Sequence, residues 1–172
     1  MSLAYEQPWK LADKFSPAGA ALADRHYSRR KPGSPQFMPP GETVVLVTWD
    51  RCAVFGWWRP HPRSGLKAMN GLDGWTCSIF RREGGVRASD LILAAEDFLV
   101  ASGKGCGPDG LLTYVDVRKV PGTNPGACFR HAGYRSRGWS ADGHKRLLWK
   151  PYELAGVRAC GISPIKEMDR DG

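Results

Sequence analysis

The sequence has 172 residues, with 25 Lys and Arg against 17 Asp and Glu, which gives a net charge of +8. A chain of this length buries most of its apolar surface in a single domain, so the composition excludes a dependence on disulfides for stability. The positive charge favours partners that carry phosphate groups, although a basic surface without a specific partner has the same composition.

The cysteines, histidines and apolar runs narrow the class of protein further. The five cysteines are scattered and never spaced as Cys-x-x-Cys, which argues against a disulfide framework and a zinc finger. The four histidines lack a recognised ligand spacing, so no metal site is predicted. The N-terminus lacks the pattern of a secretory signal, and no apolar run approaches the roughly 20 residues of a membrane span. We therefore expect no membrane partner and a location in the reducing cytoplasm.

The N-terminal part of the chain predicts a short helix followed by a basic loop. Ser16 followed by Pro17 is typical of a helix start, and the alanine-rich residues 17–27 continue the helix. Residues 28–41 contain four prolines and three adjacent basic residues. This composition prevents a regular element and predicts a loop.

Three strands are predicted next. Residues 43–49 and 52–58 are β-branched and aromatic runs on either side of Asp50 and Arg51, and this pattern favours a tight antiparallel hairpin. After a loop rich in Pro, Gly and Asn, residues 75–82 alternate apolar and polar side chains and predict a third strand.

A strand, helix and strand unit forms the centre of the sequence. Ser89 and Asp90 open an amphipathic helix that Gly103 closes, and residues 111–117 form a compact apolar strand. We expect this strand to pair in parallel with residues 75–82 through a right-handed crossover.

The C-terminal part predicts another short helix and an antiparallel pair. An Asn-Pro pair at 124–125 starts a helix that stops at Gly133, and Trp139 with residues 146–149 indicates two closing strands. The sequence thus predicts one mixed α/β domain over residues 1–151. Residues 152–172 show no clear period, so we expect them to form a tail that is flexible in part.

Residues 80–89, between the third strand and the long helix, have the composition of an anion-binding loop. The first-turn amides of a helix lack partners within it, and glycines let a phosphate approach the backbone closely. Arg82 or Arg87 can add bidentate donors to a pyrophosphate. An ordinary turn from strand to helix has the same composition, so this pattern alone leaves both interpretations open.

The order of these elements resembles the GNAT N-acyltransferases, in which this loop binds the pyrophosphate of acyl-CoA. Arg82 and Gly85 match the family's loop pattern, whereas Arg87 occupies its last small position. Residues 129–134 (Phe-Arg-His-Ala-Gly-Tyr) resemble the family's ending, but Phe129 stands where a general-acid Tyr often occurs, and a phenyl ring cannot donate a proton.

The GNAT resemblance implies a fold and a cofactor. The expected fold is an α/β (α+β) single domain whose mixed central sheet has an antiparallel N-terminal hairpin and a parallel strand-helix-strand core. The expected cofactor is acetyl-CoA or a related acyl-CoA. The residues to which the resemblance assigns cofactor binding are Phe80, Arg81, Arg82, Gly84, Gly85, Arg87, Ala88, Ser89 and Asn124.

A narrower resemblance covers nearly the whole chain. It rests on residues 26–28 (His-Tyr-Ser) after the first helix, on residues 80–81 and Ser89, and on residues 129–134. These segments are similar to the Mom-type GNAT-like proteins of bacteriophages, which add an acyl-derived group to the exocyclic amine of adenine in phage DNA. The resemblance implies a nucleobase acceptor, and the host cytoplasm as the location if the protein is phage-encoded.

The basic loop after the first helix is the predicted nucleic-acid contact. It mixes cations with an aromatic ring and hydroxyls, which together grip a phosphate backbone and stack on or hydrogen-bond to a base. The predicted contact residues are His26, Tyr27, Ser28, Arg29, Arg30 and Lys31. Modifying a base within a duplex requires its extrusion into an aromatic pocket. Tryptophans 49, 57, 58 and 75 are candidates for that pocket, although strand tryptophans are more often core.

Four residues are candidates for catalysis. Asp116 ends the strand at 111–117, where its carboxylate would accept a proton from an amine if burial raised its pKa; a strand-end charge facing water is the alternative. Tyr114 is a candidate acid, and Ser89 lies at the helix start. His131 lies three residues after Cys128 on one helical face, which suits thiol and imidazole chemistry, although a packed Cys128 beside an exposed His131 is the simpler arrangement.

Three functions are consistent with these features. The first is a GNAT-like acyltransferase that modifies nucleobase amines in phage DNA. The second keeps the fold and acetyl-CoA but transfers the acyl group to a small-molecule or protein amine. The third is a non-catalytic nucleic-acid-binding module with a degenerate GNAT fold, and Phe129 in the position of the general acid supports it. DNA and acyl-CoA are the expected partners, and the sequence leaves a homodimer open.

Overall fold

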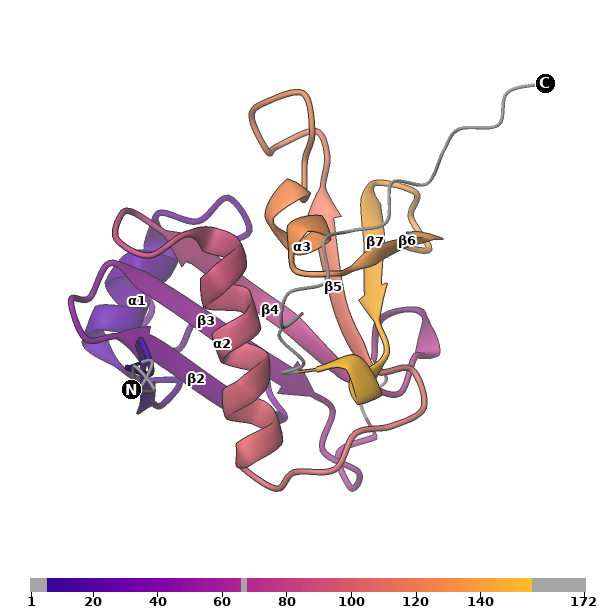
Figure 1. Ribbon diagram of the computed structural model, residues 1–172, viewed down its shortest axis with the longest axis horizontal. Helices are drawn as coiled ribbons and strands as arrows, with labels where there is room; N and C mark the ends of the chain where they lie inside the picture. The colour runs from indigo at the N-terminus through magenta and orange to yellow at the C-terminus, as the bar shows by residue number, and fades with distance from the viewer. Residues whose placement is uncertain (1–5, 66–67, 156–172) are drawn as a thin grey trace, which may run out of the picture.

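The computed structural model describes residues 6–65 and 68–155, which fold around a seven-stranded sheet (Figure 1). The strand order across the sheet is β1-β2-β3-β4-β5-β7-β6. The strands are β1 (Trp9–Ala12), β2 (Glu42–Thr48), β3 (Ala53–Arg59), β4 (Trp75–Arg82), β5 (Leu111–Asp116), β6 (Arg135–Trp139) and β7 (Lys145–Lys150).

The pairing of the strands confirms the predicted α+β architecture, with an antiparallel hairpin and a parallel strand-helix-strand core in one mixed sheet. β1 to β4 are successive antiparallel neighbours, β4 and β5 are parallel, and β7 pairs antiparallel with both β5 and β6. A parallel pair needs a crossover, which here is the helix α2 (Ala88–Ala101). The predicted hairpin is β2–β3, and the predicted closing pair is β6–β7.

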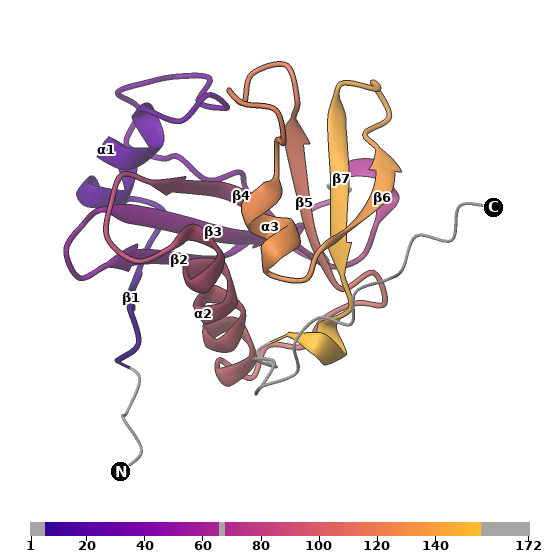
Figure 2. The ribbon, with the colours of Figure 1, turned by 45° about the horizontal axis from the view of Figure 1, so that its top comes forward.

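The parallel pair at the centre of the sheet is short. β4 and β5 pair only from Trp75 opposite Leu111 to Cys77 opposite Thr113. β4 then continues to Arg82 and β5 to Asp116, and the two strands diverge over these ends (Figure 2). The sheet therefore opens into a V between its antiparallel halves.

Helices cover both faces of the sheet. α1 (Pro17–Asp24) lies on one face, and α2 with the short α3 (Ala127–His131) lies on the other (Figures 1 and 2). The Ser16 side chain accepts a hydrogen bond from the Gly19 amide, as expected for the predicted start of α1. Two one-turn 3₁₀ helices, Met69–Gly71 and Tyr152–Leu154, complete the described elements.

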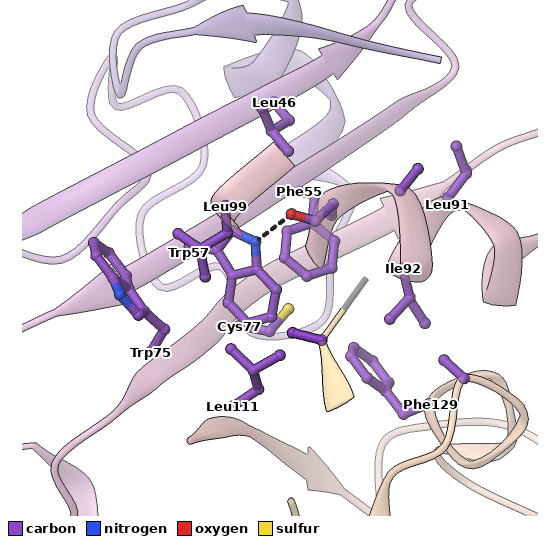
Figure 3. Packing of buried hydrophobic residues seen from close by; sticks show 14 of the residues in the cluster. Leu46, Phe55, Trp57, Trp75, Cys77, Leu91, Ile92, Leu99, Leu111 and Phe129 are labelled. Carbon is purple, nitrogen blue, oxygen red and sulfur yellow. Dashed lines mark hydrogen bonds between the residues drawn. The ribbon is translucent and has the colours of Figure 1, made fainter. Parts of the chain in front are cut away.

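The larger of two apolar cores lies between the sheet and α2 (Figure 3). Trp57 is completely buried there, and its indole nitrogen donates to the Ala95 carbonyl in α2 over 3.0 Å. Trp75 is also completely buried. Both tryptophans are therefore core residues, and the alternative in which they line a base pocket is wrong.

A buried ion pair joins β7 to α2, and its lysine also contacts the backbone at the end of α3. Lys150 donates to Glu96 Oε2 over 2.7 Å and to the Ala132 carbonyl over 2.8 Å. Both charged side chains are at most 5% exposed. The Tyr134 ring lies 5.8 Å from the Lys150 ammonium, and burial raises the pKa of Tyr134 well above its usual value. A buried charge needs such a partner because its desolvation is costly.

Some boundaries differ from the sequence predictions for identifiable reasons. Strand β1 was not predicted, because its four residues are too few to show a period. Helix α1 ends at Asp24 rather than near residue 27, since the chain turns there into the basic loop. Arg87, not Ser89, is the N-cap of α2. The predicted tail lies outside the described residues from residue 156 onward. Over the described residues, no helix is long and apolar enough to cross a membrane.

Candidate functional site

A cleft of about 1140 Å³ opens where β4 and β5 diverge. Its walls come from the two diverging strands, from the basic loop after α1 and from the region around α3. The residues that line it include His26, Tyr27, Lys31, Tyr114, Cys128, Phe129 and Lys145. A cleft at the carboxyl end of parallel strands is the usual place for a ligand in a sheet of this kind.

The two strand edges that face the cleft offer backbone hydrogen-bonding groups. Beyond Cys77 and Thr113, β4 and β5 have no register with each other in the described structure. The opposite edges of the two strands are occupied by β3 and β7. Buried backbone groups need partners, so the free edges suit an extended ligand that carries amides of its own.

One wall of the cleft is formed by the loop after α1, where His26 and Tyr27 stack. Their ring centres are 4.3 Å apart. The Ser28 amide donates to His26 Nδ1 over 3.2 Å, and Ser28 Oγ lies 2.7 Å from the same nitrogen. Because an amide can only donate, Nδ1 is an acceptor and the neutral ring carries its proton on Nε2.

The ionisation of this pair is shifted by burial in the cleft wall. Burial, with a smaller contribution from the Arg81 charge, lowers the pKa of His26 to about 4. Burial also raises the pKa of Tyr27, and a hydrogen bond from the Asp116 backbone offsets part of the rise. At neutral pH both rings are therefore uncharged, and Tyr27 reaches from its own loop to the end of β5.

The cations of the basic loop have different surroundings. Arg29 is largely buried and braces the loop through Asp24 Oδ1 at 2.8 Å, the Gln36 carbonyl at 3.0 Å and the Ser34 carbonyl. Arg30 and Lys31 are exposed, line the cleft and make no ion pair with another described residue. The structure thus gives Arg29 a structural position and leaves Arg30 and Lys31 available to an anion.

The predicted anion-binding loop lies beside the cleft rather than in its lining, except for Phe80. Arg82 closes the loop by donating to the Val86 and Gly85 carbonyls over 2.6 and 3.2 Å. Gly85 has a φ of 74°, a left-handed conformation that favours glycine. No described side chain caps the first turn of α2, and the amides of that turn have no partners within the helix.

Glu83 ties this loop to the basic loop. It accepts from Arg25 Nε over 2.5 Å and from Arg81 Nε over 2.9 Å, and Arg81 also donates to the Arg25 carbonyl over 2.6 Å. Hydrogen bonds from Arg25 and then Arg81 lower the pKa of Glu83 to about 2. Arg81 is thus held within the protein, while a Cβ added at Gly84 would have no other residue within 4 Å and Arg87 is exposed.

The four predicted catalytic residues are not brought together. Tyr114 lines the cleft and donates to the Met69 carbonyl over 3.2 Å, and burial raises its pKa. Asp116 accepts from the Arg118 side chain over 3.1 Å, which lowers its pKa to about 2. The condition set for Asp116 as a base, a pKa raised by burial, is therefore not met. Ser89 is buried in the first turn of α2.

Of the residues predicted around α3, some line the cleft and others lie outside it. Cys128 is half-buried and lines the cleft, where burial raises the pKa of its thiol, whereas His131 is exposed. Phe129 also lines the cleft and packs edge to face on Phe80 and Tyr134. Asn124 is exposed and accepts from Arg130 over 2.6 Å, and it is not among the lining residues.

Sequence reasoning missed several cleft residues. Lys145 begins β7 and lines the cleft, although it stands in sequence next to the predicted closing strand. Met38 also lines the cleft, on the α1 side of the sheet, next to Trp58, which was among the candidate pocket tryptophans. No local pattern marks these positions, because the strand order brings them together. The part of the chain that the structure describes holds no group of three His, Cys, Asp or Glu side chains that could bind a metal.

Comparisons with known proteins give one likeness. No family model matches the sequence, and no curated protein matches it. Among solved structures, the chain is similar to the aminoglycoside 6'-N-acetyltransferase from Enterococcus faecium, with 14% identity and a TM-score of 0.49 over 82% of this chain and 93% of that chain. At this identity and TM-score, the likeness says nothing about substrate or residue roles.

Proposed function

We propose that the protein is an acyltransferase that binds acyl-CoA between β4 and β5 and transfers the acyl group to a nucleobase amine in DNA. The observation that carries the proposal is the V-shaped cleft with two free strand edges. The pantetheine arm of CoA is an extended chain with two amides, so it suits such edges. The uncapped first turn of α2, next to the loop with Arg87, suits the pyrophosphate.

Acyl-CoA supplies a thioester whose acyl carbon an amine attacks, so that a C–N bond forms as the C–S bond breaks. The protein's own contribution is to orient the amine and move protons. Tyr114 lines the cleft and is protonated at neutral pH, as tyrosines normally are, so it is a candidate proton donor to the departing thiolate. The amine proton leaves to solvent, since Asp116 is held ionised but weakly basic by Arg118.

A nucleobase acceptor is supported by the α1 side of the cleft. The stacked, uncharged rings of His26 and Tyr27 present a flat surface to a base. Arg30 and Lys31 stand next to them for the phosphates. The similarity of this loop to the Mom-type phage proteins adds the adenine amine as the acceptor of choice.

The central experiment is nucleoside mass spectrometry of DNA from cells that express the protein. A new nucleoside mass would identify the base and the acyl-derived group together. In parallel, calorimetry with acetyl-CoA tests the donor site, where Arg87→Glu should weaken binding. The matched control is Arg135→Glu, which makes the same charge change on the far edge strand β6 and should not affect it. Unmodified DNA together with no CoA binding would refute the proposal.

The second candidate acceptor, a small-molecule or protein amine, keeps the same donor site. A salt titration separates the two, because binding to DNA through several phosphates weakens steeply with salt. Tight CoA binding with no affinity for DNA would favour the second candidate. DNA binding with no thermal shift on adding CoA would instead favour a non-catalytic module, for which Phe129 in the acid position is the supporting observation.

A further inference from the structure

The edge of the sheet farthest from α1 carries an exposed tryptophan in contact with an arginine. Trp139 ends β6 with 47% of its surface exposed. Arg146 lies opposite it in β7, with its guanidinium carbon 5.3 Å from the centre of the indole ring. Lys145, the preceding residue in β7, has its side chain on the opposite face of the strand and lines the cleft. A guanidinium stacked on an indole presents a flat cationic surface.

This surface is held in a fixed position relative to the cleft. The Asn70 side chain donates to the Trp139 carbonyl and accepts from the Ala141 amide, both over 3.0 Å. The neighbouring Met69 lines the cleft, and its carbonyl accepts from Tyr114. The β6–β7 hairpin is thus fastened to a segment that borders the cleft, beside β5 and on the side away from β4 (Figure 2).

The charges of the hairpin favour an anionic partner. Residues 135–146 contain four Lys and Arg against the single carboxylate of Asp142. Asp142 is occupied within the turn, where it accepts from Ser140 Oγ over 2.5 Å and from the His144 amide over 3.0 Å. Lys145 and Arg146 form no ion pair with any other residue that the structure describes.

Protection of an edge strand is the simplest alternative explanation for these cations, since charges on an edge prevent association with other strands. That explanation suits Arg135 and Arg137 on the edge strand itself. It does not account for Lys145, which is on the inner strand β7, or for an exposed indole on the edge, which would promote association.

We propose that Trp139 and Arg146 form a second polynucleotide-binding surface, which Lys145 connects to the cleft. A base next to the modified one stacks on the Trp139–Arg146 pair, and Arg146 and Lys145 contact the phosphates. The loop with Arg30 and Lys31 holds the strand on the opposite side of the cleft. An extruded base needs contacts on both of its flanks. The inference rests on the proposed nucleobase acceptor and adds the contact on the second flank.

The test measures binding of a fluorescent single-stranded oligonucleotide of about 12 nucleotides, within the usual range of site sizes. Trp139→Ala should weaken binding about tenfold, the loss expected for one stacked base, and Trp139→Phe should restore most of it. In Lys145→Ala/Arg146→Ala, the slope of log K against log salt should become less steep by about 1.4 if both cations contact phosphates.

The opposite edge of the sheet, at β1, supplies matched controls. Trp49 is 69% exposed, and the Lys10 ammonium lies 5.6 Å from its ring, so it has the same kind of cation contact next to β1. Trp49→Ala and Lys10→Ala should bind the oligonucleotide like the parent. Trp139→Ala should also show the parent's thermal shift with acetyl-CoA, which verifies that it folds and keeps its donor site.

The outcomes separate this inference from the proposed function. Parent-like binding by Trp139→Ala, or an equal loss in Trp49→Ala, would overturn the inference and leave the proposed transfer intact. Binding that depends on Trp139 in a protein that never modifies DNA would support the surface and reject the transfer. A parent protein without affinity for the oligonucleotide would overturn both.

Discussion

Removing one partner of the buried Lys150–Glu96 pair should destabilise the protein strongly. The Lys150 ammonium makes two hydrogen bonds, to Glu96 at 2.7 Å and to the Ala132 carbonyl at 2.8 Å. Lys150→Met keeps the length of the side chain but leaves the fully buried Glu96 carboxylate without this cation. Such a change costs about 3–5 kcal/mol. At this chain length each kcal/mol lowers Tm by about 2–4 °C, so the fall should be about 6–20 °C.

The double variant Glu96→Leu/Lys150→Met tests the reason for that loss. Both charges are then replaced by apolar groups of similar size, and the unfolding free energy should return to within about 1–2 kcal/mol of the parent. Lys104→Met is the matched control, because Lys104 also pairs with a glutamate, Glu42, at 3.1 Å but is 35% exposed. It should cost at most about 1 kcal/mol. Urea unfolding that gave equal losses for the two lysines would refute the reasoning, as would a double variant whose loss is the sum of the single ones.

Three further predictions follow from the cleft and its surroundings. The pKa of His26 in the folded state is about 4, below its usual value, so its contribution to stability is present above about pH 6.5 and is lost as the pH falls towards 4. The fall in Tm between pH 7.5 and pH 5 should therefore be smaller in His26→Asn than in the parent. Arg118 lowers the pKa of Asp116 to about 2, so the interaction of these two residues stabilises the fold above about pH 4 and is lost as the pH falls towards 2. The difference in Tm between the parent and Arg118→Ala should therefore shrink on acidification, and a constant difference would contradict this. Gly74→Ala should destabilise the protein by about 2 kcal/mol or more, because a Cβ there would lie 2.2 Å from the Gly110 carbonyl oxygen at the start of the β4–β5 pair. Gly84→Ala is the control: its Cβ would have no other residue within 4 Å, so this variant should unfold in urea like the parent.

The regular elements could be predicted from the sequence because their signals are local. The Ser16 and Pro17 pair marked the start of α1, and the apolar alternation of residues 75–82 marked β4 within its observed bounds. The parallel β4–α2–β5 unit followed from the order strand, helix, strand. β1 lacked such a signal, since four residues pair with β2 through backbone groups that any sequence can supply.

The candidate site was only partly predictable, because it depends on where the strands stop pairing. Nothing in residues 75–82 or 111–117 states that their register ends at Cys77 and Thr113, yet that end creates the cleft. Tyr114 and the basic loop, which the sequence singled out, line the cleft, while Lys145 was missed. The sequence left the pKa of Asp116 open because its partner, Arg118, lies two residues along the chain in a turn whose shape the sequence does not reveal.

The hydrogen bonds of Glu83 change how variants of the two predicted binding loops should be interpreted. Arg25 belongs to the loop with the candidate base contacts, and Arg81 ends the strand that leads into the candidate pyrophosphate loop. Glu83 holds both, and Arg81 returns to the Arg25 carbonyl. A substitution at any of these three residues therefore moves both loops, and a loss of CoA or DNA binding in such a variant does not identify a contact. Arg87 and Lys31 are exposed and make no ion pair with another described residue, so their substitution reports on each ligand separately.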